Sequence, residues 1–533
     1  MLPFEWLEQN AAWLELGELR GDKLIFKKNQ SPVVDALLRE NIKNKLDDGF
    51  KAERERLAGF KGIEPCEPSE DFKGELRGYQ KVGLGWLRFL DQMGGGGCLA
   101  DDMGLGKPAQ ALALLDLLKK EGRKGPSIVV CPKSLIFNWL REIKKFTPHL
   151  LGVSYTGPKR SALLEKLDEY DIILTTYGTL RRDIDKLVKE NFLYAILDEG
   201  QVIKNPESQS AKSSFLLQAE RRIILSGTPV ENHLGELWSL YNFLNPGMLG
   251  SAESFKSRFG SGIDADSISL KRLQKTLRPF ILRRRKEEVA TDLPEKIEET
   301  ITCEMEPEQK KVYNKLKRAA KTNIFSKVAQ QGMGRSKLHI LEALLRLRQA
   351  ACHPALIGDE YLDHNSGKFK VLLSMLNEVE DEGHKVLIFS QFTSLLALLR
   401  KQLDAQGKVY EYLDGKTTNR EGRVDHFQND PNVKFFLISL KAGGVGLNLT
   451  AADYVFILDP WWNPAVEAQA IDRAHRIGQD KKVFAYRFVS GESIEERIAD
   501  LQESKRKLAD SIVTGSDSLV GDMTTDDLED LFT

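Results

Sequence analysis

Short apolar runs alternate with longer stretches of helical character along most of the chain. Two sets of such runs, rich in β-branched, aliphatic and aromatic residues, are separated by a long segment that has few of them. The first set is 128–130, 172–175, 195–197 and 223–225, and the second is 386–389, 435–438, 455–458 and 484–488. Because these runs are apolar on both faces, they predict strands of parallel sheets covered by helices. The pattern predicts an α/β protein with two lobes.

The segment between the two sets has a helical pattern. Residues 308–348 are rich in Lys, Leu, Ala and Arg, which are strong helix formers. A turn-rich stretch at 63–68 marks an earlier boundary. We therefore expect an N-terminal segment that resembles the end of a larger region, a first lobe, a helical insertion, a second lobe, and a C-terminal helix with an acidic tail. These parts span residues 1–65, 66–250, 251–364, 365–500 and 501–533.

Composition narrows the class of protein. Of the 533 residues, 41% are hydrophobic and 29% are charged, which is typical of a globular protein of several packing units. No apolar run reaches the roughly 18 residues that a membrane-spanning helix needs. The first ten residues contain Glu5 and Glu8 but no base, unlike a secretory signal. The five cysteines form no CxxC pair, which argues against a zinc site or a disulfide scaffold and favours the cytoplasm.

The charge is balanced overall but uneven along the chain. Lys and Arg number 77 against 78 Asp and Glu, so any binding of a polyanion would need a local basic patch. Residues 271–286 hold eight basic and no acidic side chains, whereas residues 516–533 hold six acids and no base. A solvated helix face or a fraying tail explains such runs equally well on charge alone. The acidic tail could dock on its own lobe or on a protein partner.

Candidate chemistry begins at residues 100–108, Ala-Asp-Asp-Met-Gly-Leu-Gly-Lys-Pro. They follow a strand-like run at 98–100 and precede a helical run at 109–120. That context suits a phosphate-binding loop, because glycines let backbone N–H groups close on phosphates and the helix N-terminus and lysine attract them. Alone, this short motif is weak evidence.

Three further motifs follow in order. Asp198 and Glu199 come directly after a strand-like run and suit a magnesium ion and an attacking water, although capping acids at a helix start are the common alternative. Residues 226–229, Ser-Gly-Thr-Pro, also follow such a run. Arg473 and Arg476, three residues apart, would share a helical face and could act as arginine fingers, or simply form surface salt bridges. Coincidence does not explain all four motifs together.

At this point the chain resembles the Swi/Snf-type ATPases of helicase superfamily two, from residue 76 to about residue 497. The resemblance is carried by residues 225–232, 236–240, 279–284, 347–354, 441–449, 459–464 and 472–479. It implies an α/β fold of two RecA-like lobes with parallel sheets and a helical insertion between them. It further implies that the protein binds ATP and Mg²⁺ and translocates along double-stranded DNA. We expect a monomer in a bacterial or archaeal cytoplasm, associated with the nucleoid.

The resemblance also implies roles for individual residues. Arg77 and Gln80 would recognise adenine, Asp198 would hold Mg²⁺, Glu199 would orient the attacking water, and Arg473 and Arg476 would be fingers. The phosphates would be held by Gly104, Leu105, Gly106 and Lys107, and the second lobe would approach them through Gly444 and Gly446. The DNA contacts would be Lys133, Ser134, Thr175, Thr176, Gln391 and Lys441, mainly to phosphates.

One departure from the family falls within the phosphate loop. Where the family has Thr or Ser after the lysine, this chain has Pro108, which lacks both the hydroxyl and the backbone N–H. Proline also disfavours helical geometry at the preceding residue, Lys107. Losing one charge-assisted hydrogen bond costs about 1.5–3 kcal/mol, so turnover should be weakened. The alternatives to a translocase are a DNA-binding scaffold with a crippled ATPase and a strand-separating helicase.

Overall fold

The computed structural model describes two compact units, residues 1–290 and 291–533. The described residues are 14, 17–20, 23–26, 30, 34, 63–158, 160–227, 234–259, 273, 276–290, 292–443, 447–461 and 464–499. Within them, no helix combines the length and the hydropathy needed to cross a membrane. We describe each unit on its own.

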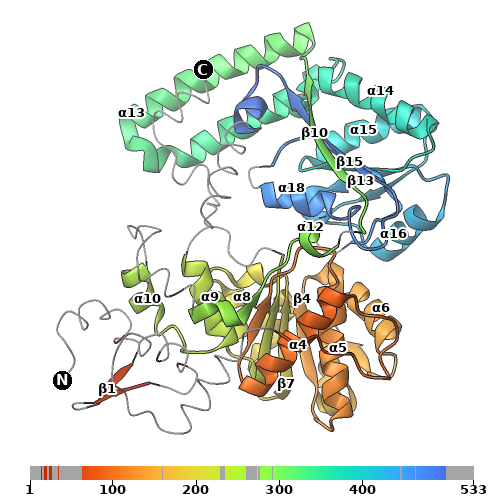
Figure 1. Ribbon diagram of the computed structural model, residues 1–533. Helices are drawn as coiled ribbons and strands as arrows, with labels where there is room; N and C mark the ends of the chain where they lie inside the picture. Colours follow the sequence, from red (N-terminus) through yellow and green to blue (C-terminus); the bar gives the residue numbers. More distant parts are fainter. Residues whose placement is uncertain are drawn as a thin grey trace. The chain divides into compact units, whose positions relative to one another are not determined.

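The first unit is built on a seven-stranded sheet whose paired strands are all parallel. Its strand order is β5-β6-β4-β7-β8-β3-β9 (Figure 1). The central strands are buried along most of their length, as expected of apolar runs covered on both faces. The strands are β3 (Gly97–Leu99), β4 (Ser127–Cys131), β5 (Gly152–Ser154), β6 (Ile172–Thr176), β7 (Asn191–Asp198), β8 (Gln218–Leu225) and β9 (Ile281–Leu282).

Helices cover both faces of this sheet. One layer comprises α4 (Gly78–Met93), α5 (Lys107–Lys120) and α6 (Ile136–Phe146), and the other comprises α7 (Tyr177–Leu187), α8 (Gln209–Phe215) and α9 (Leu234–Leu244) (Figure 1). The second layer packs on a core that includes Ile128, Ile173 and Leu197. Shorter elements of the unit are β1 (Glu18–Arg20) and β2 (Lys23–Ile25), which form an antiparallel hairpin, α10 (Ala252–Phe259) and α12 (Lys286–Val289).

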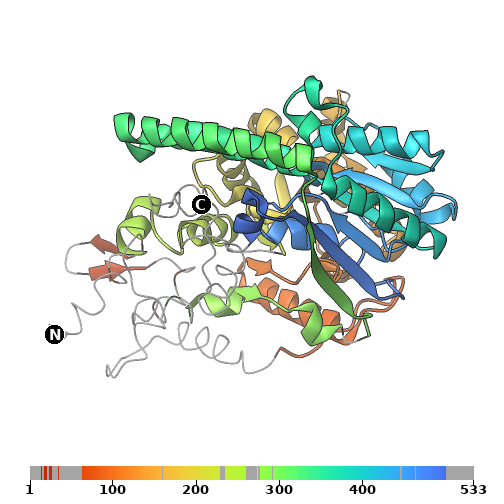
Figure 2. The same cartoon turned by 90° about the horizontal axis from the view of Figure 1, so that it is seen from above.

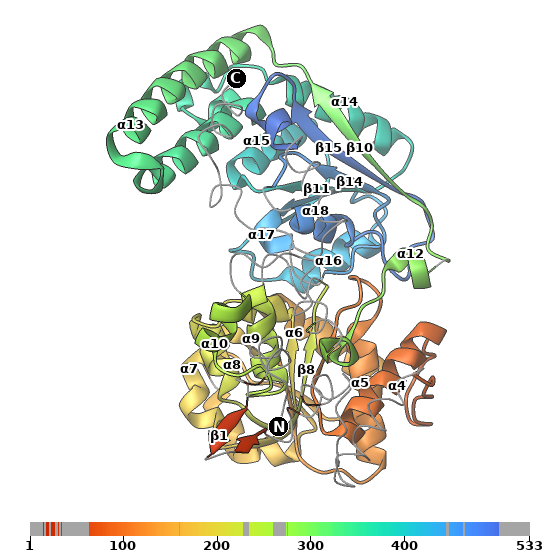
Figure 3. The same ribbon diagram turned by 60° about the vertical axis from the view of Figure 1, so that its left-hand side comes forward.

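The second unit repeats this design with six strands, all paired in parallel, in the order β10-β15-β14-β11-β13-β12 (Figure 3). Helices α14 (Gly367–Asp381) and α15 (Thr393–Ala405) cover one face with their leucines. The strands are β10 (Lys296–Cys303), β11 (Val386–Ser390), β12 (Tyr410–Leu413), β13 (Phe435–Ser439), β14 (Tyr454–Ile457) and β15 (Val483–Ser490). The remaining helices are α16 (Arg420–Asn429), α17 (Leu440–Gly443) and α18 (Pro464–Ile471).

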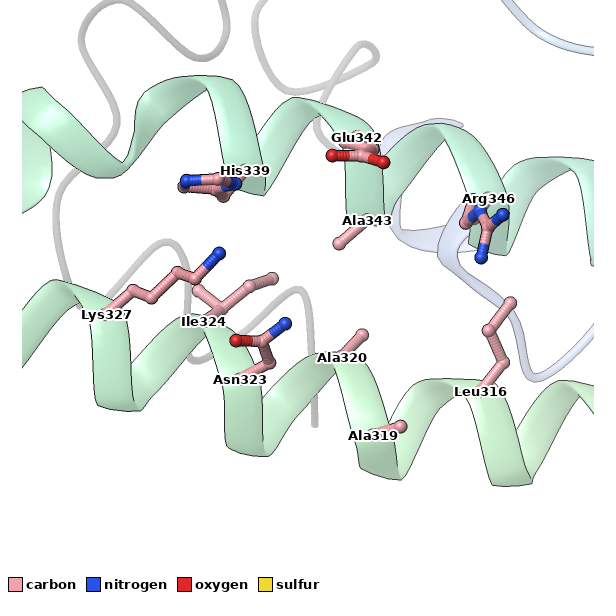
Figure 4. A pocket seen from close by; sticks show the side chains of 10 residues that line it. All are labelled: Leu316, Ala319, Ala320, Asn323, Ile324, Lys327, His339, Glu342, Ala343 and Arg346. Atoms are coloured by element: carbon pink, nitrogen blue, oxygen red, sulfur yellow. The ribbon is translucent and has the colours of Figure 1, made fainter.

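Helix α13 (Pro307–Cys352) extends beyond the sheet of its own unit (Figure 2). It folds back on itself, because residues 316–327 and 339–346 face each other across a pocket of about 230 Å³ (Figure 4). Alanine side chains from both stretches line the pocket together with Leu316, Lys327, His339 and Arg346. No residue proposed for nucleotide or DNA binding lies in it.

The parallel α/β architecture and every one of the eight strand-like runs named from the sequence are confirmed. The segment 251–364, expected to be helical, contains α13 but also two strands. β9 extends the first sheet and β10 extends the second. The sequence hid them because β9 has only two residues and β10, at a sheet edge, is interrupted by adjacent charged residues, Glu298 and Glu299.

Candidate nucleotide-binding site

Parallel pairing gathers the candidate motifs of the first unit at one edge of its sheet. The carboxyl ends of parallel strands point the same way, so the segments that follow β3, β4, β6, β7 and β8 meet at one edge. The loop 101–106 follows β3, Asp198 ends β7, and Ser226 follows β8. In open α/β sheets, ligands bind at this edge. Residues separated by up to about 125 positions in the chain therefore form one candidate site.

The loop before α5 requires its glycines. Gly104 and Gly106 have φ angles of 86° and 74°, in the left-handed region that favours glycine. A Cβ atom on Gly106 would lie 2.4 Å from Nε2 of Gln80. Helix α5 then begins at Lys107, so its free N–H groups and positive dipole end point into the loop. This is the geometry in which backbone amides bind an anion.

Lys107 and the predicted adenine residues lie on this loop. Nζ of Lys107 donates to the carbonyl oxygens of Asp101 (2.6 Å) and Asp102 (3.2 Å). Nε2 of Gln80 donates to the Leu105 carbonyl (3.0 Å), and its Oε1 accepts from the Arg77 N–H (2.9 Å). The structure thus brings Arg77, Gln80 and the phosphate loop together, while adenine recognition stays a prediction.

Pro108 is accommodated within the first turn of α5. Proline disfavours helical geometry at the preceding residue, yet α5 starts at Lys107. The first turn of a helix has no intrahelical acceptor for its N–H groups, so a proline costs little there. What Pro108 removes is one hydroxyl and one N–H from the anion-binding end of the helix.

The acidic pair sits at the end of β7, in a constrained position. Asp198 and Glu199 are 6% and 8% exposed. Glu199 has φ 52° and ψ 52°, a left-handed conformation that is uncommon for a residue with a side chain and turns the chain sharply after the strand. The neighbouring Gly200 has no room for a side chain, because a Cβ would lie 2.3 Å from Cγ2 of Ile224. The pair is therefore a built feature of the site rather than a surface helix cap.

Burial and the neighbouring charge of Glu199 perturb the pKa of Asp198. Burial, followed by the charge of Glu199, raises the pKa of Asp198 to about 7. The indole N–H of Trp139, which donates to Asp198 Oδ2 (2.8 Å), and the charge of Lys107 act in the opposite direction. A buried carboxylate that resists ionisation gains stability from a bound cation.

Three side chains that the sequence analysis missed hold the acidic pair. Trp139, on α6, is fully buried and donates to Asp198 as described, and the hydroxyl of Tyr177 donates to the Asp198 carbonyl (2.9 Å). Gln201 donates through Nε2 to Glu199 (2.7 Å) and accepts at Oε1 from the Ser226 hydroxyl (3.0 Å). The motif at Asp198 is thus joined to the Ser-Gly-Thr-Pro motif. The position of Ser226 directly after a strand-like run was the one feature of the sequence that indicated this contact between the two motifs.

The residues predicted to contact DNA from the first unit differ in exposure. Lys133 is exposed just after β4, whereas Ser134 is buried. The hydroxyl of Thr175 is inside the sheet and donates to the Tyr155 carbonyl (3.0 Å), and the partly exposed Thr176 caps α7 by accepting from the Thr179 N–H (3.1 Å). Lys133 and Thr176 are the two that present side-chain surface.

In the second unit, Gln391 follows β11 at the carboxyl edge of the sheet. Its N–H donates to both carboxylate oxygens of Asp459 (3.3 and 3.2 Å), and its Oε1 accepts from Arg348 (3.4 Å). Its Nε2 is buried and has no hydrogen-bond acceptor in the described part of the chain. A buried amide donor of this kind is suited to a phosphate oxygen of a ligand.

The two candidate fingers lie in turns beyond α18, not on a helix as their spacing suggested. Arg473 is 2% exposed, and its carbonyl accepts from the Leu449 N–H (3.0 Å). Nη1 of Arg476 donates to the Leu447 carbonyl (3.2 Å). The structure therefore brings both arginines to the segment that follows residue 446.

Some predictions lie outside the described residues. They concern Gly444, Gly446, the side chain of Lys441, the acidic tail at 516–533, and Lys271, Arg272 and Lys275 of the basic run. Within the described part of that run, Arg278, Arg283 and Arg285 are exposed, but Arg284 and Lys286 are buried. Neither a solvated face nor a DNA contact accounts for those two.

Comparison with known proteins matches two family models to successive parts of the chain. A model of the SNF2-related domain matches residues 79–356, and a model of the helicase conserved C-terminal domain matches residues 367–478. The YwqA protein of Bacillus subtilis (strain 168), provisionally named an ATP-dependent helicase/translocase, is 38% identical over 518 residues, which cover 94% of this chain and 56% of that protein.

A mouse relative shows the same extent of similarity. The SWI/SNF-related matrix-associated actin-dependent regulator of chromatin, subfamily A member 1, of Mus musculus is 38% identical over 85% of this chain and 45% of its own length. The chain thus spans about half the length of these two curated relatives. Among solved structures, the Sulfolobus solfataricus SWI2/SNF2 ATPase core in complex with double-stranded DNA is 39% identical, with a TM-score of 0.44, over 89% of this chain and 99% of that one.

Proposed function

This chain belongs to the SNF2-related family of helicase-like ATPases, and we propose on that basis that it is a DNA-dependent ATPase that translocates along double-stranded DNA. The observation that carries the proposal is the edge of the first sheet, where an anion-binding loop and a buried carboxylate pair lie at the ends of β3 and β7. A nucleoside triphosphate with a divalent cation has the complementary charges.

Each residue of the edge has one task in this mechanism. The backbone N–H groups before α5 and the ammonium of Lys107 bind the phosphates, exchanging the carbonyls of Asp101 and Asp102 for phosphate oxygens. Glu199, fixed by Gln201, accepts a hydrogen bond from the attacking water and orients it toward the γ-phosphate. Arg473 and Arg476 belong to the second unit and not to this edge, and we assign to them the stabilisation of negative charge in the transition state, as guanidinium groups do in such reactions.

The residues present fit a magnesium ion. Mg²⁺ prefers one or two carboxylates and keeps several waters, and the buried Asp198 offers such an oxygen ligand. Bound there, the ion would neutralise charge on the phosphates. Among the described residues, no group of three or more His, Cys, Asp or Glu is arranged to hold a metal by itself, so the phosphates would complete the coordination.

Binding to DNA would be mainly to phosphates. The name of the Bacillus subtilis relative includes translocase activity, and the exposed Lys133 carries a cation suited to a phosphate backbone. We therefore expect affinity to fall steeply with salt and to depend little on base sequence.

The experiment that tests the proposal is steady-state ATP hydrolysis with and without duplex DNA, followed by displacement of a triplex-forming strand as a readout of translocation. DNA-stimulated hydrolysis with displacement supports a translocase. Hydrolysis that DNA does not stimulate contradicts the proposal. Separation of a tailed duplex would instead indicate a strand-separating helicase.

Pro108 favours a second candidate, a DNA-binding scaffold whose ATPase is weak. Its ring removes a hydroxyl and an N–H at the anion-binding end of α5, a loss worth about one to two decades in affinity. The variant Pro108→Thr separates the candidates. If it restores strong DNA-stimulated hydrolysis to a silent chain, the motor is intact apart from this residue; if both stay silent while duplex DNA binds, the scaffold is correct.

A further inference from the structure

Arg284 is a buried hub beneath the phosphate loop. It is 8% exposed and comes from the segment that follows β9, far from the loop in sequence. Its Nε and Nη2 donate to Oδ1 (2.8 Å) and Oδ2 (2.5 Å) of Asp101, whose side chain has no exposure to solvent. This bidentate pair holds the residue at which the loop begins.

The same guanidinium reaches the residues that hold the other end of the loop. Its Nη2 also donates to Oε1 of Gln110 (2.9 Å), and its Nη1 donates to the Tyr79 carbonyl. Gln110 in turn donates to the Gly106 carbonyl (3.4 Å), and the Tyr79 hydroxyl donates to the Leu105 carbonyl (3.0 Å). The guanidinium lies over the Tyr79 ring, 5.2 Å from its centre. One side chain thus connects the start and the end of the loop.

Hydrogen bonds of the backbone also attach the segment around Arg284 to the phosphate loop. The Ala100 N–H donates to the Leu282 carbonyl (2.7 Å), and the Asp102 N–H donates to the Arg284 carbonyl (3.1 Å). The Lys286 N–H donates to Oδ2 of Asp102 (3.0 Å). Residues 282–286, which we call the strap, therefore follow the loop before the chain leaves the first unit after Ala290.

Gly83 of α4 provides the space that this hub needs. A Cβ atom there would lie 1.9 Å from Oε1 of Gln110 and 2.8 Å from Nη2 of Arg284. The absence of a side chain at Gly83 is what allows the Arg284–Gln110 contact. Substitution at Gly83 therefore disturbs the hub without removing any charge.

We propose that Arg284 is a positioning residue for the nucleotide site, which fixes the phosphate loop in its anion-binding shape and ties it to the strap. The inference rests on the proposed function for the identity of the ligand. It does not rest on it for the geometry, since Arg284 acts through Asp101, Gln110 and Tyr79 and touches no phosphate itself. Lysine cannot replace it, because an ammonium lacks the planar fork that contacts all three.

The test compares Arg284→Lys with Arg283→Lys, the same change at the exposed neighbour. The first readout is hydrogen–deuterium exchange of peptides covering 101–110, measured without nucleotide. We expect Arg284→Lys to speed exchange in these peptides at least tenfold while β4 and β7 keep their wild-type exchange, and Arg283→Lys to change neither. Charge is conserved in both variants, so Asp101 is not left as an unpaired buried charge.

The second readout is the affinity for a fluorescent ADP analogue, measured without DNA. Arg284→Lys should weaken it about tenfold, and Gly83→Ala should produce the same pair of effects with the arginine still present. Unchanged loop exchange would overturn the proposal, and so would faster exchange throughout the unit with an equal fall in its melting temperature. If the wild-type chain binds no nucleotide, the proposed function fails, yet the exchange experiment still decides the role of Arg284.

Discussion

The two lobes place an aspartate at the same position of the same kind of sheet but surround it differently. Asp198 ends β7 in the first unit, and Asp459 follows β14 in the second. Burial raises the pKa of Asp198 to about 7 and that of Asp459 to about 6. Asp198 lies beside a second carboxylate, Glu199, whereas Asp459 accepts from the Ser390 hydroxyl and the Gln391 N–H. In the first lobe two carboxylates lie side by side, whereas in the second lobe hydrogen-bond donors surround the single carboxylate of Asp459.

The contrast extends to the buried lysines. Lys107 of the first lobe donates to the neutral carbonyl groups of Asp101 and Asp102, so its ammonium can exchange them for phosphate oxygens. Lys368 of the second lobe pairs with Glu495 at 2.7 Å, with the two side chains 1% and 0% exposed. Lys107 thus has neutral hydrogen-bond partners, whereas Lys368 and Glu495 neutralise each other. The difference shows that a buried lysine can be kept available for an anion or used to hold a lobe together, depending on its partners.

The largest expected effect tests the cohesion of the second lobe. Lys368→Met leaves Glu495 charged, buried and without its cation, which costs about 3–5 kcal/mol of unfolding free energy. Urea unfolding of the second lobe measures it. The control is Lys370→Met on the same helix, whose side chain is 78% exposed, so that its pair with Glu306 is worth at most about 1 kcal/mol. If the two changes lower the unfolding free energy equally, the buried pair of Lys368 and Glu495 has no special role in the second lobe.

The next effect concerns Lys107, whose ammonium group is available to bind a phosphate. Lys107→Ala should lower ATP turnover by about a hundred- to a thousandfold, the range for losing a preorganised donor, with only a small loss of stability. Phosphate release and a melting curve measure the two quantities. Lys120→Ala, at the exposed end of the same helix, should change neither. A melting temperature that falls in step with turnover would mean that Lys107 is structural, like Lys368.

A smaller effect distinguishes two buried tryptophans of the first lobe, one that contacts the acidic pair and one that does not. Trp139→Phe removes the donor to Asp198, and Trp86→Phe removes an equally buried donor to the Pro279 carbonyl (2.9 Å). Each should cost about 1–3 kcal/mol of stability. Only Trp139→Phe should also lower turnover, by about tenfold, because it alone changes the charge distribution at the acidic pair. Equal turnover in both variants would exclude a role for Trp139 in the site.

The smallest effect is a pH dependence in the second lobe. Burial lowers the pKa of His353 to about 4, and its neutral Nδ1 accepts from the Ala355 N–H (3.1 Å). The unfolded chain binds this proton near pH 6.5, so the stability contribution is complete above pH 6.5 and is lost as the pH falls toward 4. Between pH 7.5 and 5, about 1–2 kcal/mol should be lost.

The matching variant is His353→Asn, which keeps an acceptor for the Ala355 N–H but does not titrate. Urea midpoints of the second lobe, measured across that pH range, should change less in this variant than in the wild-type chain. If the two chains show the same slope, another group carries the acid sensitivity.

The sequence by itself determined the features of the structure that depend on neighbouring residues. The eight apolar runs became strands, and the glycines of the loop 101–107 marked a left-handed turn before a helix, because strand period, glycine conformation and helix start are local properties. The positions of the phosphate loop and the acidic pair directly after strand-like runs were also readable from the sequence, and they lie at one sheet edge because parallel strands end together.

Only the tertiary structure decided which distant side chains meet. Arg284 belonged to a run of basic residues whose charge suggested a surface, yet it lies 183 positions from Asp101 and forms a buried pair with it. Trp139 looked like any core residue of α6, but it donates to Asp198, 59 positions away. Such contacts depend on strand order and helix packing, which bring together residues whose own neighbourhoods carry no sign of each other.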